Sequence, residues 1–288
     1  MRKRVFLGGM VLILSLIIGC KTEDENPTTE TIESKLKDAK IVRLAVVNTP
    51  DYDGLMDFLL PDFEKETGLN VQLYSGSDVH HRAKNGEADV VIAHYGKAPV
   101  ENFVLEGWGT WPEMVFSNQA VLIGHKSDPA NIKGEKSASK AFAKIAASNS
   151  VYAESAISGV AFLSEMLFGL AGNPEKGNWY ISKPSAQGRA AKIVQEKQGY
   201  FLWGAAPFLR YKEKNAIDDL EIMVSEDPML QRIMAISIVK AEKVKGVNTK
   251  GAELLRDYLL RADTQVKVAQ FRSKWSDLQL WWPAARDN

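Results

Sequence analysis

Short apolar runs alternate with amphipathic segments in the first half of the chain. Residues 41–47 form a β-branched apolar run that stops at Asn48 and Pro50, which predicts a buried parallel strand followed by a loop. Residues 55–63 carry apolar side chains at helical spacing, and Gly68 is expected to end that helix. The next segments predict a strand over 69–74, a helix over 79–85 and a strand over 88–93.

This order of strands and helices favours an α/β fold with a mostly parallel sheet and helices on both of its faces. Ligands bind such sheets at the carboxyl ends of the strands. The polar segments expected at these ends are residues 48–53, 75–78 and 94–97.

The second half repeats the alternation without repeating the sequence. Residues 115–124 predict a strand, and the polar run 125–136 indicates passage into a second domain. Two later apolar runs, 220–224 and 233–239, are interpreted as strands that return to the first domain. Two crossings predict a hinged groove between two lobes. The expected limits are 41–122 with 223–288 for lobe 1, and 123–222 for lobe 2.

The first residues have the layout of an export signal. Three basic residues precede an apolar run of about fourteen residues, shorter than the roughly twenty that a membrane-spanning helix needs. The run leads into Cys20, the single cysteine of the chain, in a setting that resembles the lipobox of bacterial lipoproteins. We therefore expect a signal over 1–19, lipidation of Cys20, and a polar tether over 20–40. The alternative is an ordinary cleaved signal or an uncleaved anchor.

The charge balance and the motifs of the chain argue against several classes of function. The 36 basic and 36 acidic residues balance, and nothing indicates nucleic-acid binding. The four histidines lack metal-ligand spacing with cysteine, so neither a metal nor another cofactor is expected. No nucleophile elbow, phosphate-binding loop or zinc-hydrolase motif is present, which argues against an enzyme.

Several stretches resemble the tungstate-binding proteins of bacterial importers. They are LAVVNTPDYDGLMDFLLPDFEKETGLNV, NGEADVVIAH, FVLEGWG and VLIGHKSDPANIKG, which together lie within residues 44–134. The resemblance implies a type II periplasmic-binding-protein fold, in which each of two lobes has a mixed, mostly parallel sheet with flanking helices. It also implies an oxyanion or other small ligand between the lobes and an importer permease as partner. The export signal and Cys20 predict a membrane-anchored lipoprotein on the periplasmic or extracellular side.

The ligand loops depart from the family pattern. Glu154 and Ala205 stand where the family has arginines, while Asn48 and Thr49 keep polar side chains in the first loop. An acid in place of a cationic partner predicts weak tungstate or molybdate binding, or a preference for another ligand.

Candidate ligand contacts follow from these loops and strand ends. Most of them have an alternative role as helix caps, turn formers or core residues. The candidates are Asn48, Thr49, Ser75, Ser77, His94, Ser155, Ser158, Gly159 and Trp203.

Two other functions stay open from the sequence. Asp53, Asp78 and Glu154 are acids near the predicted loops, which suggests a cationic or amine-bearing ligand instead of an oxyanion. Trp203 and Tyr180 suggest stacking on an organic ligand, with the core as their alternative place. A sensing or scaffold lipoprotein with the same fold is the second alternative.

Overall fold

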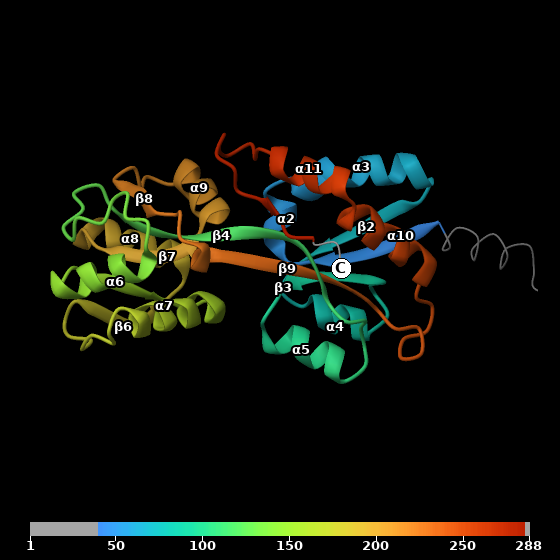
Figure 1. Cartoon of the computed structure of the whole chain (residues 1–288), viewed down its shortest axis with the longest axis horizontal. Coiled ribbons are helices and arrows are strands. Elements are labelled where there is room, and N and C mark those ends of the chain that lie inside the picture. The colour runs from blue at the N-terminus through green and yellow to red at the C-terminus, as the bar shows by residue number, and fades with distance from the viewer. Residues whose placement is uncertain (1–39, 286–288) are drawn as a thin grey trace, which may run out of the picture. The chain divides into compact units, whose positions relative to one another are not determined.

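The first lobe is built on a sheet whose strands come from both ends of the described chain. The computed structural model describes residues 40–285. The order in this sheet is β2-β1-β3-β9-β4, where β1, β2 and β3 are parallel and β9 runs antiparallel to β3 and β4 (Figure 1). The strands are β1 (Ile41–Val46), β2 (Asn70–Ser75), β3 (Val90–His94), β4 (Glu113–His125) and β9 (Gln231–Ile238), and the short β10 (Trp282–Pro283) pairs with β4.

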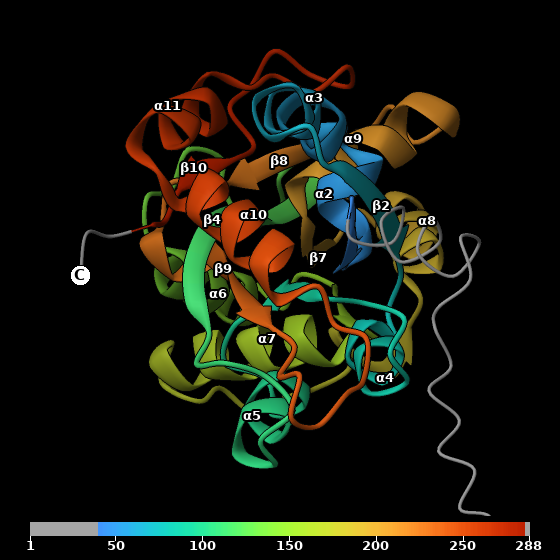
Figure 2. The same ribbon diagram turned by 90° about the vertical axis from the view of Figure 1, so that its right-hand side faces the viewer.

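Helices cover both faces of this sheet, as the apolar character of the strands requires. One core contains Leu55, Leu59 and Phe63 of a helix that ends at Gly68, whose φ of 69° is the left-handed conformation that favours glycine. The opposite core contains Val79 and Phe103. Figure 2 shows the two groups of helices on opposite sides of the strands. They are α3 (Leu55–Thr67), α10 (Thr249–Leu260) and α11 (Ala262–Gln270) on one side, and α4 (Val79–Lys84) and α5 (Ala98–Leu105) on the other.

The second lobe repeats this plan with a different core. Its strands β5, β6 and β7 are parallel, and β7 lies antiparallel to the second part of β4. Phe142, Tyr152 and Phe168 pack with ring centroids 4.6–5.3 Å apart in the centre of an aromatic cluster. The elements are α6 (Ala138–Ala147), β5 (Tyr152–Ser155), α7 (Ser158–Leu170), β6 (Tyr180–Ser185), α8 (Gln187–Lys197), β7 (Tyr200–Gly204), α9 (Ala205–Lys214), β8 (Leu220–Val224) and the short 3-10 helix η1 (Pro228–Leu230).

Strand β4 connects the lobes by changing its partners along its length. Residues Glu113 to Gln119 pair with β9, and Ala120 to His125 pair with β7 and β8. The prediction that residues 220–224 return to the first lobe is wrong, because β8 pairs with the second part of β4. An apolar run shows that a strand is buried, but not which sheet receives it. The return is made by β9.

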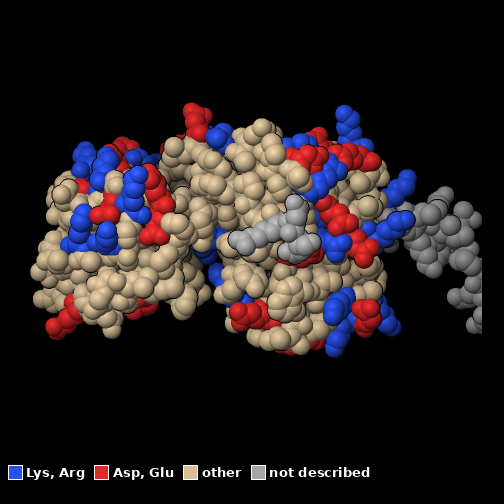
Figure 3. Space-filling model, viewed as in Figure 1, with Lys and Arg blue, Asp and Glu red and all other residues tan. Residues whose placement is uncertain are grey.

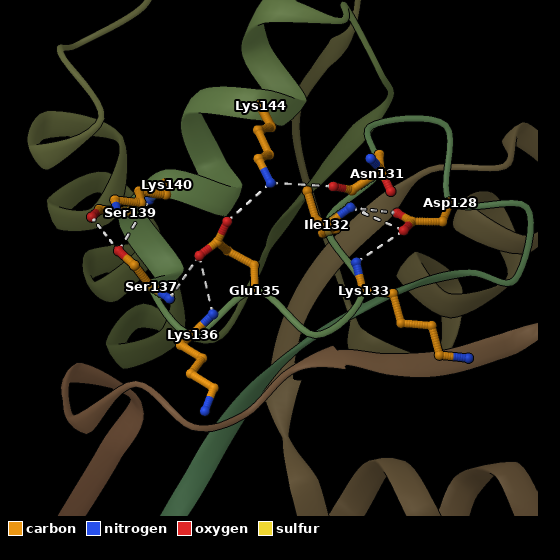
Figure 4. A network of polar contacts seen from close by, with 10 residues as sticks. All are labelled: Asp128, Asn131, Ile132, Lys133, Glu135, Lys136, Ser137, Ser139, Lys140 and Lys144. Atoms are coloured by element: carbon orange, nitrogen blue, oxygen red, sulfur yellow. Dashed lines mark hydrogen bonds and ion pairs between the residues drawn. The ribbon is translucent and has the colours of Figure 1, made fainter.

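The polar run after β4 is a folded loop of the second lobe. Asp128 accepts hydrogen bonds from the backbone amides of Ile132 and Lys133, both at 2.9 Å, and Glu135 accepts one from the backbone amide of Lys136 at 3.1 Å (Figure 4). The side chain of Lys144 also donates from Nζ to Glu135 at 2.9 Å. Tyr200 also donates to Asp128 at 2.6 Å. Side-chain acceptors thus satisfy backbone donors that have no strand or helix partner.

The predicted α/β class, with mostly parallel strands and flanking helices, is confirmed. Within residues 40–285, no helix is both long enough and apolar enough to cross a bilayer. The predicted signal, Cys20 and nearly all of the tether lie outside the described residues.

Candidate functional site

The carboxyl ends of β1 and β2 meet at one edge of the first sheet. Val46 is in register with Ser75, and Ser75 Oγ lies 3.3 Å from Asn48 Oδ1. Asn48 and Thr49 open a short helix, α2 (Asn48–Tyr52), directly after the strand. The sequence prediction that these polar residues lie near one another therefore holds for Asn48 and Ser75, whereas Ser77 is exposed in the next turn.

Two basic side chains lie near the amino end of α7, so the lobes approach each other there. A methyl carbon placed on Gly159 would lie 2.9 Å from Lys97 Nζ and 3.5 Å from Arg232 Nη2. Lys97 immediately precedes α5, and Arg232 lies near the start of β9. We call Lys97 and Arg232 the groove cations. They come from the first sheet and its loops, while Gly159 belongs to the second lobe.

The groove cations have no counter-charge in the described chain. Neither side chain forms a salt bridge with a carboxylate of residues 40–285. Burial and then the charge of Arg232 lower the pKa of Lys97, and burial lowers the pKa of Arg232. Figure 3 shows basic atoms in the hollow between the lobes. Both side chains are half-buried, and charges withdrawn from water are normally paired, so two unpaired cations at one place favour an anionic ligand.

His94 stands beside this pair as a neutral group. Burial, then Arg232 and then Lys97 hold its pKa well below the ordinary value of 6.5. Its Nδ1 atom is buried and has no hydrogen-bond partner among the described residues. Those residues hold no group of three or more histidine, cysteine or acidic side chains that fits a metal ion. His94 therefore adds polarity to the site without adding a positive charge.

The amino end of α7 adds backbone donors to the site. Ile157 precedes the helix without a side-chain cap. Ser155 Oγ accepts hydrogen bonds from the Ile157 amide and from Gln187 Nε2, both at 3.0 Å, so Ser155 shapes the turn. The first amides of a helix have no acceptor within it and carry partial positive charge, which suits an anion. Ser158 and Gly159 are the first residues of α7, and Gly159 lies close to the groove cations.

Glu154 lies in a different place from the one that the family comparison suggested. Its side chain lines a surface hollow together with Glu165, Lys176 and Tyr180. The charges of Glu154 and Glu165 also contribute to the raised pKa of Tyr180, after burial as the main cause. The pairing of β5 with β6 is irregular between Ala153 and Ser155, and within this stretch Glu154 is half-buried whereas Ser155 is buried.

Thr49 and Trp203 line a cavity of about 290 Å³ between α2 and α9. Trp203 also packs against Phe208 and Tyr211, with ring centroids 6.4 and 5.6 Å apart. Ala205 is buried at the start of α9 and supplies no charge in place of the family arginine.

The three acids that suggested a cationic ligand do not come together. Asp53 is buried and accepts a hydrogen bond from Trp281 Nε1 at 2.5 Å. Asp78 accepts one from Tyr74 and lies beside Arg82. Glu154 occupies the separate hollow on the second lobe. Each acid has its own neighbours, so that prediction is wrong for this arrangement.

The sequence reading missed both groove cations. Lys97 was only the last residue of a strand-end segment, and Arg232 precedes the apolar run 233–239 that was assigned to a returning strand. A usable signal was present, since Arg232 is the single charged residue within the eight of β9. A charge inside a strand that crosses between lobes indicates either a buried pair or a ligand.

The chain is similar in sequence to known solute-binding proteins. A family model described as bacterial extracellular solute-binding protein matches residues 44–265. The chain is 27% identical over 281 residues to the tungstate-binding protein TupA of Peptoclostridium acidaminophilum, with 96% of both proteins covered. It is 28% identical over 230 residues to TupA of Campylobacter jejuni, covering 77% of this chain and 84% of that one.

Two solved structures are similar along most of the chain. The tungstate-binding protein of Desulfovibrio alaskensis G20 has a TM-score of 0.74 at 24% identity, covering 85% of this chain and 99% of that one. The tungstate ABC transporter structure from Geobacter sulfurreducens has a TM-score of 0.68 at 26% identity, covering 80% and 98%. The predicted type II periplasmic-binding-protein fold is therefore confirmed.

Proposed function

The chain belongs to the bacterial extracellular solute-binding proteins, and from this premise we propose that it binds an oxyanion between its lobes and delivers it to an ABC importer. One observation supports an oxyanion as the ligand. Lys97 and Arg232 lie together near the amino end of α7 without a carboxylate partner in the described chain. A dianion would match their two positive charges.

The ligand would be held from both lobes. Arg232 supplies planar N–H donors that suit the edge of a tetrahedral oxyanion, and Lys97 supplies a point charge. The first amides of α7 supply donors from the other lobe. An anion that contacts both lobes stabilises their closed arrangement by its own binding free energy.

Tungstate is the first ligand to test, because the similar proteins above are named for it. Glu154 does not argue against tungstate, since its carboxylate lines the hollow beside Tyr180. The similar structure from Geobacter sulfurreducens is named as a tungstate ABC transporter, and we propose a role in transport here, without catalysis.

We further propose that the protein is exported and held at the membrane by lipid on Cys20. The apolar run before the single cysteine supports this proposal. Mass spectrometry of the protein purified from membranes is expected to show a lipid-modified amino-terminal cysteine. An unmodified Cys20 would contradict it.

A thermal-shift panel tests the ligand class. Tungstate, molybdate, sulfate and phosphate are compared with putrescine and Mg²⁺ at matched ionic strength. An oxyanion at a hundred times its Kd stabilises the fold by about 2.7 kcal/mol, or roughly 5–10 °C for a chain of this size. Stabilisation by amines or Mg²⁺ alone would refute the proposal.

Two variants separate specific binding from general salt effects. Arg232→Met removes a groove cation, whereas Arg189→Met removes an exposed arginine on α8. The oxyanion shift is expected to fall sharply in the first variant and to persist in the second. Equal loss in both would indicate non-specific screening of surface charge.

A further inference from the structure

A second cavity lies between the lobes and has a different chemistry from the groove cations. It has a volume of about 290 Å³, at the small end of the roughly 300–1,000 Å³ range of ligand pockets. The first lobe contributes α2 and Trp275 of the C-terminal segment, and the second contributes β7 and α9. Its lining includes the side chains of Tyr52, Trp203, Arg210, Tyr211, Lys214 and Trp275.

Arg210 is stacked on aromatic rings but has no polar partner among residues 40–285. Its guanidinium carbon lies 4.8 Å from the centroid of the Tyr52 ring and 5.6 Å from that of Trp275. No carboxylate of residues 40–285 forms a salt bridge with it. Stacking uses the faces of a guanidinium and leaves the N–H donors at its edge available for a bidentate acceptor.

Lys214 adds a second positive charge one helical turn further along α9. Its Nζ lies 5.2 Å from the Trp275 ring centroid, and it too has no salt bridge to a described carboxylate. The acid that lines this cavity, Asp53, accepts a hydrogen bond from Trp281 Nε1 and forms no ion pair with Arg210 or Lys214. The cavity therefore has an excess of positive charge.

The remaining wall is flat and apolar. Trp203 and Tyr211 meet edge to face with centroids 5.6 Å apart, and Ala206 and Pro207 continue this surface along α9. Aromatic walls favour a planar apolar body, because offset stacking and edge contacts both need flat partners. A bare oxyanion would gain nothing from this surface.

We propose that this cavity binds a small organic anion with a planar apolar body, such as an aromatic carboxylate. The carboxylate pairs with the edge of Arg210 and is attracted by Lys214. The ring lies against Trp203 and Tyr211. Neither groove cation lines this cavity, so variants of its own residues test it independently of the oxyanion proposal.

Benzoate is the probe, and tryptophan fluorescence is the readout, because Trp203 and Trp275 both line the cavity. We expect saturable binding with a dissociation constant on the order of 0.1 mM. Benzyl alcohol, which lacks the charge, and acetate, which lacks the ring, are expected to bind at least about tenfold more weakly. Equal binding of benzyl alcohol would show that Arg210 contributes no charge recognition.

Variants locate the site. Arg210→Met is expected to weaken benzoate binding by about tenfold or more. Lys214→Met is also expected to weaken it. Lys274→Met is the matched control, since Lys274 Nζ lies 4.7 Å from the Trp275 ring centroid but does not line the cavity. Lys214 is exposed, so its variant keeps the test valid if Arg210→Met fails to fold.

The same titration on Arg232→Met separates the two sites. Benzoate affinity is expected to stay within about twofold of the unmodified protein, even where oxyanion binding is lost. Benzoate binding that disappears in Arg232→Met and persists in Arg210→Met would overturn the proposal, because the probe would then occupy the groove cations.

Discussion

Two arginines of the first sheet have opposite surroundings. Arg43 on β1 donates from Nε to Asp89 Oδ2 at 3.1 Å and from Nη2 to the Gly246 carbonyl at 2.8 Å, and its backbone amide donates to the same carboxylate at 2.8 Å. Arg232 on β9 has a second cation, Lys97, as its charged neighbour and no described carboxylate as a salt-bridge partner.

The contrast separates a charge that maintains the fold from a charge that is available to a ligand. Asp89 is fully buried, and Asn248 donates its amide to it at 2.9 Å, so the Arg43 network ties β1, β3 and the segment before α10 together. The groove cations instead keep an uncompensated positive potential in the folded protein. Desolvated cations of this kind disfavour the folded state until an anion binds.

Arg43→Met is expected to have the largest effect of the changes proposed here. It leaves the buried Asp89 carboxylate without its cation, which costs about 3 kcal/mol of unfolding free energy, the low end of 3–5 because Arg43 is partly exposed. Urea unfolding measures this loss, and oxyanion affinity should change less than about twofold. A loss below about 1 kcal/mol would contradict the structural role of this pair.

Arg232→Met should show the opposite pattern. The unfolding free energy without ligand is expected to stay unchanged or to rise, because the variant removes a desolvated cation. Oxyanion affinity should fall by about ten- to a hundredfold, from the loss of charge-assisted hydrogen bonds worth roughly 1.5–3 kcal/mol. Strong destabilisation with unchanged affinity would assign Arg232 to the fold instead of the ligand.

Acidic pH offers a smaller test that acts through His94. The pKa of this buried imidazole is lower in the folded protein than the ordinary 6.5, so the unfolded chain takes up a proton first as the pH falls. Stability should therefore decrease as the pH falls below about 6.5, and His94→Gln should reduce that slope. Urea unfolding at pH 7.5 and 5.5 checks this, and an unchanged slope would contradict the burial of His94.

His80 is the control for the pH measurement. Burial and then Lys84 lower its pKa to about 4, which acts in the same direction. His80→Gln should reduce the slope without changing oxyanion affinity, because His80 packs against Phe103 with ring centroids 5.2 Å apart, inside the first lobe.

Glu154→Arg is expected to have the smallest effect. In the structure Glu154 lines the hollow with Lys176 and Tyr180, so oxyanion affinity should change less than about threefold. Calorimetry decides between this result and the prediction from the sequence. A gain of tenfold or more would mean that the family comparison located the ligand better than the side-chain positions do.

The fold was predictable because it depends on patterns that are local in the sequence. The apolar runs of β1 and β3, the helical spacing of α3 and the stop at Gly68 all appear as expected. The partner of β8 was not predictable, because apolar character marks burial and not the neighbouring strand. The polar ends of β1 and β2 were found for the same local reason as the strands.

The groove cations were harder to predict, because their proposed role depends on the absence of an acidic partner among the described residues. Lys97 and Arg232 lie 135 positions apart in the sequence, and only the fold shows that no acid of residues 40–285 forms an ion pair with either. Glu154 shows the opposite error. The family resemblance gave it the place of an arginine at the ligand, whereas its side chain lines the hollow beside Tyr180.

Calorimetric titration of tungstate into the unmodified protein and into the Lys97→Met, Arg232→Met double variant tests the central claim most directly. The account predicts one saturable oxyanion site in the unmodified protein and a loss of at least about a hundredfold in affinity in the double variant, whose fold is checked by urea unfolding. Tungstate affinity that is the same in both proteins would contradict it.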